Sequence, residues 1–158
     1  MTLKTSCASS LRCLCQQSWW LKSLSLLSLR LWIAKVFFLS GLTKIQSWDA
    51  TLALFADEYQ VPLLPPDLAA HLSAAGELFL PVLLVLGLAT PLAALGLFAM
   101  TLVIEFFVYP GTTEHYYWML MLGVLISHGS GRWGLDWWIG KKWSAKAAST
   151  PSNPPTVP

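Results

Sequence analysis

Long apolar runs separated by short polar breaks dominate the chain. Runs at residues 24–42, 68–88 and 92–109 are each long enough to cross a bilayer as a helix, which takes roughly 20 apolar residues. A fourth run at residues 116–128 is shorter, and we expect residues 133–138 to complete it at the level of the lipid headgroups. The pattern predicts an all-α fold, a transmembrane four-helix bundle.

The longest connection, residues 43–67, also contains a helical pattern. Trp48, Leu52 and Phe55 recur at helical spacing, which predicts a short helix over residues 48–59 that lies along the membrane interface. The connection then closes with Pro65 and Pro66 before the second long run. Within that run Pro81 frees the carbonyl of Glu77 one turn earlier.

Composition supports a membrane environment. Only 11% of the 158 residues are charged and 55% are hydrophobic, whereas about 25% of a soluble domain is charged. Nine Trp and four Tyr suit an interfacial aromatic belt. The formal charge of +2 is small and scattered, so we expect no nucleic-acid partner and take the lipid bilayer as the first partner.

Positive residues gather at the two ends of the chain. The first 22 residues hold three Lys or Arg and no acid, and the segment after residue 131 holds four. The 43–67 loop holds one and the 110–115 loop none. This distribution predicts a multi-pass protein of the cell inner membrane with both termini cytoplasmic. The expected organisation is a cytoplasmic tail at 1–22, a bundle at 23–140 and a disordered cytoplasmic tail at 141–158.

Cysteine is confined to the region before the first apolar run, at Cys7, Cys13 and Cys15. A thiol–disulfide relay inside the bundle is therefore excluded. The spacing of Cys13 and Cys15 also lacks the two intervening residues of redox and zinc motifs. We interpret all three as reduced residues of the tail.

Ionisable residues inside the apolar runs are the first candidates for function. A charge at the centre of a bilayer costs at least about 2.5–3.5 kcal/mol, so such groups normally turn inward and pair. Arg30 and Lys35 lie in the first run, Glu77 in the second and Glu105 in the third. We expect these groups to form a polar interior.

Two arguments about the partner of Glu77 disagree. Lys35 and Glu77 both lie near the middle of antiparallel helices, so similar depth favours a Lys35–Glu77 pair, with Arg30 as the alternative. The helical stripe of Arg30, Phe37, Gly41 and Lys44 instead favours Arg30 as the inward cation, because Gly41 permits close helix approach. Both possibilities stay open at this stage.

The histidines offer further partners but no cofactor ligands. At the depth of Glu105 the candidates are His71, Lys44 and His115, while His128 lies on the inner side near Arg30. Only His71 and His115 lie on the same side of the membrane. They make a poor pair of axial ligands for haem, because such ligands must face one another at matching depth. No group of side chains has metal-ligand spacing, so we expect no metal. For each polar residue the plainer interpretation is a hydrogen bond that fixes helix register.

The assembled pattern resembles the DoxX family of small bacterial and archaeal membrane proteins. The matching elements cover residues 28–140: Arg30, the 38–44 segment FLSGLTK, Val61-Pro62, Glu77, the 81–90 segment PVLLVLGLAT, the 129–132 segment GSGR, and Leu135-Asp136. Carried over by position, the candidates are Arg30, Gly41, Lys44, Glu77 and Asp136. Lys35 and Glu105 fall outside the pattern.

The resemblance implies a four-helix membrane protein linked to membrane-associated oxidoreductase complexes, some of which feed electrons to quinone. Our first hypothesis is accordingly an accessory subunit of such a system, which is compatible with a redox partner protein. No cofactor is evident in the chain itself, and a quinone is the one candidate cofactor. The alternatives are proton or small-solute transport through the polar interior and a structural or assembly role, and an oligomer is compatible with each.

Overall fold

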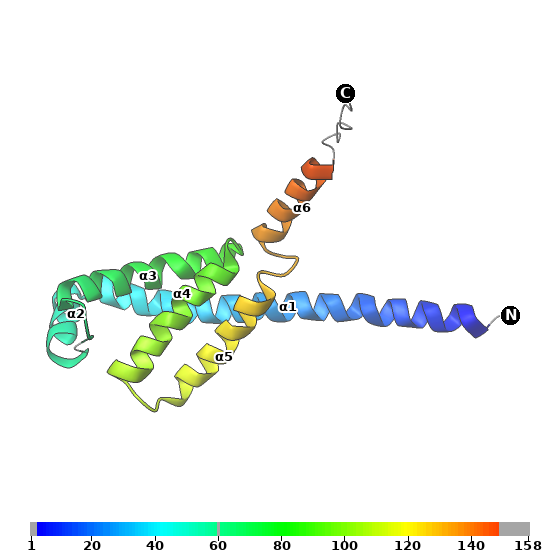
Figure 1. Ribbon diagram of the computed structural model, residues 1–158. Helices are drawn as coiled ribbons and strands as arrows, with labels where there is room; N and C mark the ends of the chain where they lie inside the picture. The colour runs from blue at the N-terminus through cyan, green and yellow to red at the C-terminus, as the bar shows by residue number, and fades with distance from the viewer. Residues whose placement is uncertain (1–2, 60, 149–158) are drawn as a thin grey trace, which may run out of the picture.

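A computed structural model describes the backbone of residues 3–59 and 61–148 and the side chains of residues 19–59 and 61–142. Figure 1 shows the described chain, which contains helices and no strand. In order, the elements are α1 (Leu3–Gln46), α2 (Trp48–Leu54), the π-helical η1 (Phe55–Tyr59), α3 (Pro66–Leu86), α4 (Thr90–Val103), the π-helical η2 (Ile104–Val108), α5 (Thr113–His128) and α6 (Leu135–Ala148). The all-α prediction is confirmed for this part of the chain.

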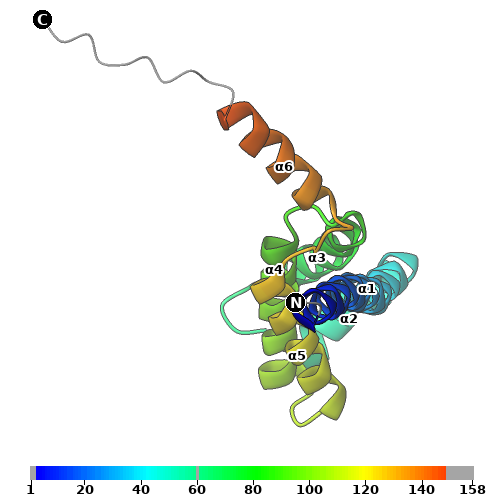
Figure 2. The ribbon, with the colours of Figure 1, turned by 90° about the vertical axis from the view of Figure 1, so that its right-hand side faces the viewer.

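Four helices form the bundle. α1 packs against α3 and α5, and α4 packs against the same two helices, so the four surround a common interior. Figure 2 looks along α1 and shows α3, α4 and α5 grouped on one side of it. Buried apolar side chains fill the middle of the bundle: Ile33, Phe37, Leu84, Leu97, Leu122 and Leu125.

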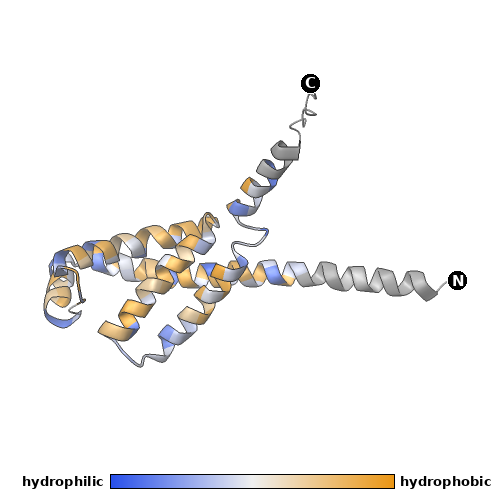
Figure 3. Ribbon diagram, viewed as in Figure 1, coloured by the Kyte–Doolittle hydropathy of each residue, from blue (hydrophilic) through white to orange (hydrophobic). Residues whose placement is uncertain are grey.

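Three helical segments of the described chain are long and apolar enough to cross a membrane: Trp19–Gln46, Pro66–Leu86 and Thr90–Val108. Their outer surfaces expose large apolar side chains such as Trp32, Phe79 and Leu92, and Figure 3 shows this apolar character along the bundle helices. In water such exposure would be costly, whereas hydrocarbon accommodates it. α5 has 16 residues, so a fourth crossing, and with it the cytoplasmic placement of both termini, stays a prediction.

The ends of the elements differ from expectation in several places. α1 begins at Leu3 and ends at Gln46, whereas the sequence suggested a span over 24–42. The later end places Lys44 on the helix instead of in the loop.

α6 makes residues 141–148 helical, so the prediction of disorder is wrong there, and residues 149–158 lie outside the described chain. Residues 133–138 do not extend α5, because a glycine-containing break precedes α6, which points away from the bundle (Figure 1).

The predicted short helix is present as α2 and η1. Phe55 packs against Ala69 and Ala70 of α3, with Trp48 and Leu52 beside them, so the apolar face covers one end of the bundle. We call this the loop end; it contains the last turns of α1, α2, η1, the first half of α3, η2 and the start of α5. The opposite, terminal end contains the α3–α4 turn, the α5–α6 connection and the part of α1 around Trp19 to Arg30.

Candidate functional site

A buried ion pair joins α1 to α3 at the loop end. The ammonium of Lys44 lies 2.8 and 2.7 Å from the two carboxylate oxygens of Glu77 and also donates to the hydroxyl of Ser40 at 3.1 Å. Ser73, four residues before Glu77 on the same helix face, donates to its carboxylate at 3.1 Å. Glu77 is 2% exposed and Lys44 17%. The carboxylate is therefore fully engaged in a site that excludes most solvent.

Gly41 explains why this pair forms. A Cβ atom at Gly41 would lie 2.9 Å from Cγ of Leu78 and 3.1 Å from Cβ of Glu77, so the absence of a side chain lets the two helices approach. Lys44, three residues further along α1, then lies above the crossing point. The stripe that the sequence placed on the inner face of α1 is confirmed, since Arg30 and Phe37 are buried on it as well.

The predicted Lys35–Glu77 pair is wrong, and so is the Arg30–Glu77 alternative, because Glu77 binds Lys44. Lys35 is exposed beside Leu31, Phe38 and Val82 on the outer surface. Nine residues separate Lys35 from Lys44, which turns them to opposite sides of an α-helix. The depth argument failed because it treated Lys44 as part of a loop.

A second buried carboxylate closes the loop end. Glu105, 6% exposed in η2, accepts three hydrogen bonds: from Nδ1 of His115 at 2.7 Å, from the backbone N–H of Gly111 at 2.8 Å and from the hydroxyl of Tyr116 at 2.9 Å. Of the three candidate partners, His115 is confirmed. The carboxylate lies at the start of α5, where the helix dipole favours a negative charge. Glu105 thereby fixes the turn between η2 and α5.

These two carboxylate clusters border one cavity of about 450 Å³. Its polar lining includes Lys44, Glu77, His115, Tyr59 and Tyr109. Its apolar lining comes from α3, α4, η2 and α5, and includes Leu72, Met100, Val103, Ile104, Val108 and Trp118. Most binding pockets for small organic ligands combine an apolar wall with a few convergent polar groups in this way.

Two tyrosines edge this cavity. The hydroxyl of Tyr109 donates to the carboxylate of Glu58 at 3.0 Å, and the rings of Tyr59 and Tyr109 meet edge to face with centroids 5.8 Å apart. Hydrogen bonds with Tyr59 and Glu58 raise the pKa of the Tyr109 hydroxyl above its usual value. Tyr109 therefore stays a neutral hydrogen-bond donor at physiological pH.

At the terminal end, Arg30 is completely buried without a carboxylate in hydrogen-bond contact. Its Nη1 donates to the carbonyl of Leu84 and its Nη2 to the carbonyl of Trp133, both at 3.4 Å, while Nε has no hydrogen-bond partner among the described residues. Leu84 lies in the last turn of α3, and the carbonyl groups at the C-terminal end of a helix attract a cation. The predicted inward orientation of Arg30 is confirmed.

Asp136 binds backbone as well. Its two carboxylate oxygens accept hydrogen bonds from the N–H groups of Ala89 at 2.7 Å and Thr90 at 3.0 Å, which begin α4, and its own N–H donates to the carbonyl of Gly87 at 2.9 Å. Asp136 therefore caps α4 from a distant part of the chain and attaches α6 to the α3–α4 turn.

Gly87 makes this junction possible. It has a φ of +67°, and a Cβ atom there would meet Nη1 of Arg30 and Cα of Gly134. Sequence reasoning did not single out Gly87 or Gly134. Ser73, in contrast, was detectable from its position four residues before Glu77.

The remaining candidates lie apart from these clusters. His71 is exposed, bonds the carbonyl of Asp67 at 2.8 Å and packs against Trp48, so it does not reach Glu105. His128 is exposed at the terminal end. The side chains of Cys7, Cys13 and Cys15 lie outside the described residues. No group of three or more His, Cys, Asp or Glu suited to a metal ion occurs in the described part of the chain.

Comparison with known proteins agrees with the residue pattern. The DoxX family profile matches residues 25–110, which include Arg30, Gly41, Lys44 and Glu77. An uncharacterized protein of Haemophilus influenzae is 32% identical over 136 residues, covering 78% of this chain and 88% of that relative. No solved structure matches the chain. With three apolar helices able to span a bilayer, the chain is a membrane protein and belongs to the DoxX family.

Proposed function

We propose that this protein is an accessory subunit of a membrane-associated oxidoreductase and that its loop-end cavity binds a quinone-like, lipid-soluble molecule. The observation that carries the proposal is the cavity of about 450 Å³ in which apolar walls meet the Glu105–His115 and Lys44–Glu77 pairs. A quinone, when bound, supplies the transfer of electrons coupled to protons. Such a molecule needs apolar contact for its ring and a hydrogen-bonding group at its oxygens.

His115 meets the second requirement. A carboxylate only accepts hydrogen bonds, so Glu105 holds the proton of His115 on Nδ1. In the neutral ring Nε2 is then an acceptor, on a side chain that lines the cavity. This arrangement suits a hydroxyl donor on the ligand.

The binding experiment uses the full-length protein in mild detergent. A quinone should co-extract with the protein, and a short-chain quinol analogue should bind to it with a measurable dissociation constant. His115→Phe keeps an aromatic ring beside Trp118 but removes both nitrogens, so we expect binding about tenfold weaker, the equivalent of one hydrogen bond. His71→Phe, the same change at an exposed position outside the cavity, should leave the dissociation constant unaltered. Absence of any quinone binding or redox partner would contradict the proposal.

Transport of protons or a small solute is the weaker alternative. Buried Ile33, Phe37, Leu97 and Leu122 separate the polar groups of the two ends, which opposes a continuous polar path. A flux assay in proteoliposomes, with Glu77→Gln as the control, distinguishes the two functions, because transport requires flux in the absence of a redox partner.

A structural or assembly role draws support from the same contacts, since Glu77 and Glu105 each tie neighbouring elements together. In that case Glu77→Gln lowers protein abundance and oxidoreductase activity in parallel. The accessory-subunit proposal instead expects His115→Phe to reduce oxidoreductase activity per molecule of folded protein, beyond any loss of abundance.

We also propose that the protein lies in the inner membrane with both termini in the cytoplasm, because seven of its ten Lys and Arg residues lie in the two terminal segments: Lys4, Arg12, Lys22, Arg132, Lys141, Lys142 and Lys146. The natural cysteines test the N-terminal side. A membrane-impermeant maleimide should label them only after the inner membrane is permeabilised. Labelling of intact spheroplasts would contradict this orientation.

A further inference from the structure

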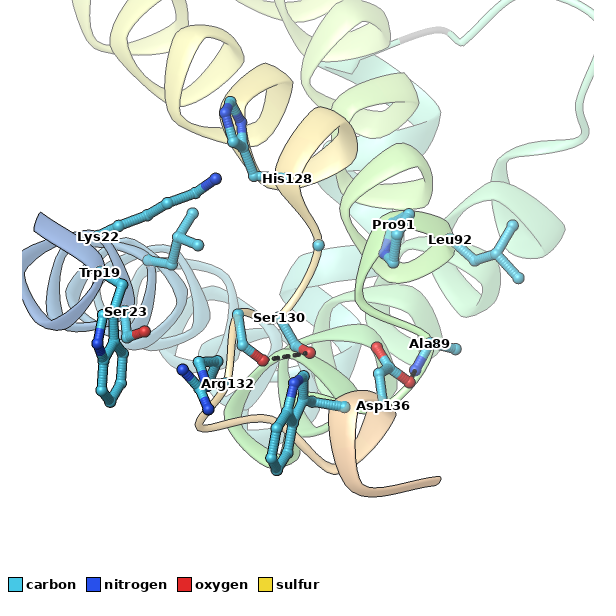
Figure 4. Close-up of a pocket in the computed structure, with 14 residues that line it drawn as sticks. Trp19, Lys22, Ser23, Ala89, Pro91, Leu92, His128, Ser130, Arg132 and Asp136 are labelled. Carbon is cyan, nitrogen blue, oxygen red and sulfur yellow. Dashed lines mark hydrogen bonds between the residues drawn. The ribbon is translucent and has the colours of Figure 1, made fainter. Parts of the chain in front are cut away.

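A second cavity, of about 730 Å³, lies at the terminal end (Figure 4). Its walls come from three separate parts of the chain: α1 around Trp19 and Lys22, the start of α4 around Pro91, and the α5–α6 connection with Arg132. It lies on the opposite side of the buried core from the loop-end cavity and shares no lining residue with it. The function proposed for the loop end does not use it.

The cations of this cavity have no acidic partner. Lys22 and Arg132 are exposed, and neither belongs to an ion pair of the described chain. Residues 1–18 and 143–158, whose side chains lie outside the description, contain no Asp or Glu. Asp136 is the one carboxylate in the lining, and its oxygens already accept from the backbone of Ala89 and Thr90. The charge of Lys22 and Arg132 is therefore available to a ligand.

Aromatic rings orient Arg132 without neutralising it. Its guanidinium carbon lies 4.2 Å from the ring centroid of Trp19 and 5.2 Å from that of Trp137. These two neighbouring rings restrict the guanidinium, while its positive charge persists. A restricted, planar guanidinium suits the paired oxygens of a phosphate group.

The place of the cavity in the fold indicates what carries that phosphate. The apolar run of α1 begins after Lys22 and that of α4 at Thr90, so the cavity lies where the hydrocarbon layer ends. Beside the cations the lining is apolar, with Leu26, Pro91 and Leu92, and the side chain of Leu92 is 71% exposed. From this combination we propose that the terminal-end cavity is a binding site for an anionic phospholipid, whose phosphate binds Arg132 and Lys22 and whose acyl chains follow the outer surface of α4.

The test measures lipid binding to the full-length protein in mild detergent by native mass spectrometry. Dioleoylphosphatidylglycerol should bind more tightly than dioleoylphosphatidylcholine. Lys22→Gln and Arg132→Gln should each weaken phosphatidylglycerol binding about fivefold and the double variant about 25-fold, since each basic residue near an anionic headgroup contributes a similar factor. Raising the salt concentration should narrow the difference between the two lipids.

Lys142→Gln is the matched control. It removes the same charge from an exposed position of α6 that does not line the cavity, so it should leave the affinity for phosphatidylglycerol intact. Equal weakening by Lys142→Gln would overturn the proposal in favour of diffuse attraction. Competition by inorganic phosphate at the concentration of the lipid would overturn it in favour of a free-anion site, and equal affinity for the two lipids would overturn it outright. Circular dichroism checks that each variant keeps its helical content.

Discussion

The two ends of the bundle satisfy their buried charges in different ways. At the loop end, oppositely charged or hydrogen-bonding side chains meet one another: Lys44 with Glu77 and His115 with Glu105. At the terminal end, Arg30 and Asp136 each bind backbone groups instead. The stability of a side-chain pair depends on both side chains. The stability of a hydrogen bond between a side chain and the backbone depends instead on the geometry of the turn that supplies the backbone group. The loop end is consequently sensitive to a change in either partner, and the terminal end to a change in the chain's path.

The largest expected effect follows from Lys44→Met. It leaves the carboxylate of Glu77 buried and unpaired, which should lower the free energy of unfolding by about 3–5 kcal/mol. Unfolding in mixed micelles of sodium dodecyl sulfate and dodecyl maltoside, followed by far-ultraviolet circular dichroism, measures the change. The double variant Lys44→Met with Glu77→Leu removes both charges and should recover most of the loss. A double variant as unstable as the sum of the single changes would contradict the pairing.

The equivalent cycle at the terminal end should behave differently. Arg30→Met and Asp136→Asn should each cost about 2–3 kcal/mol, the value of hydrogen bonds to charged groups in a buried site. The two residues share no hydrogen bond but lie close enough at the α3–α4 turn to interact electrostatically, so their coupling should be present but smaller than that of Lys44 and Glu77. The same unfolding measurement on the single and double variants gives the coupling energy. A coupling as large as that of Lys44 and Glu77 would remove the distinction between the two ends.

Gly87→Ala tests the dependence of the terminal end on backbone geometry. Alanine at a φ of +67° is strained, and its Cβ atom would meet Nη1 of Arg30, so we expect a loss of about 2 kcal/mol in unfolding free energy. Gly123→Ala, at a helical position with open space around it, is the control and should leave stability within about 0.5 kcal/mol. Equal effects of the two substitutions would show that the turn tolerates a side chain.

Lys35→Gln should have the smallest effect. Lys35 is exposed on the outer surface of α1 and has no ion pair among the described residues, so its replacement should change the unfolding free energy by no more than about 0.5 kcal/mol. A loss comparable to that of Lys44→Met would restore the Lys35–Glu77 pair that depth alone suggested.

Sequence reasoning located the helices and the inner face of α1 well, because both depend on periodicity. The apolar runs coincide with α1, α3 and α4 to within a few residues at most boundaries, and Arg30, Phe37 and Gly41 share the buried stripe that helical geometry predicted. The partner of Glu77 was missed because only Lys35 and Arg30 were weighed for it, while Lys44, although on the same helical stripe, was assigned to the 43–67 connection. One further turn of helix carries Lys44 over the crossing point at Gly41.

The terminal junction was out of reach of such reasoning. Asp136 contacts the start of α4 across 46 and 47 residues of sequence, and Gly87 matters through its φ angle and its proximity to Arg30. Neither the long-range contact of Asp136 nor the backbone angle of Gly87 produces a periodic pattern in the sequence. The resemblance to the DoxX family named Arg30 and Asp136 as candidates, but only the folded chain places both at the same turn.

The apolar middle of the bundle has an electrical consequence. Ile33, Phe37, Leu84, Leu97 and Leu122 form a layer of low polarizability between the two sets of ionised groups. A transmembrane voltage falls mainly across such a layer, where displacing one elementary charge requires roughly 2.3 kcal/mol per 100 mV. The charged groups of the loop end and those of the terminal end therefore lie on opposite sides of the layer across which a voltage would act.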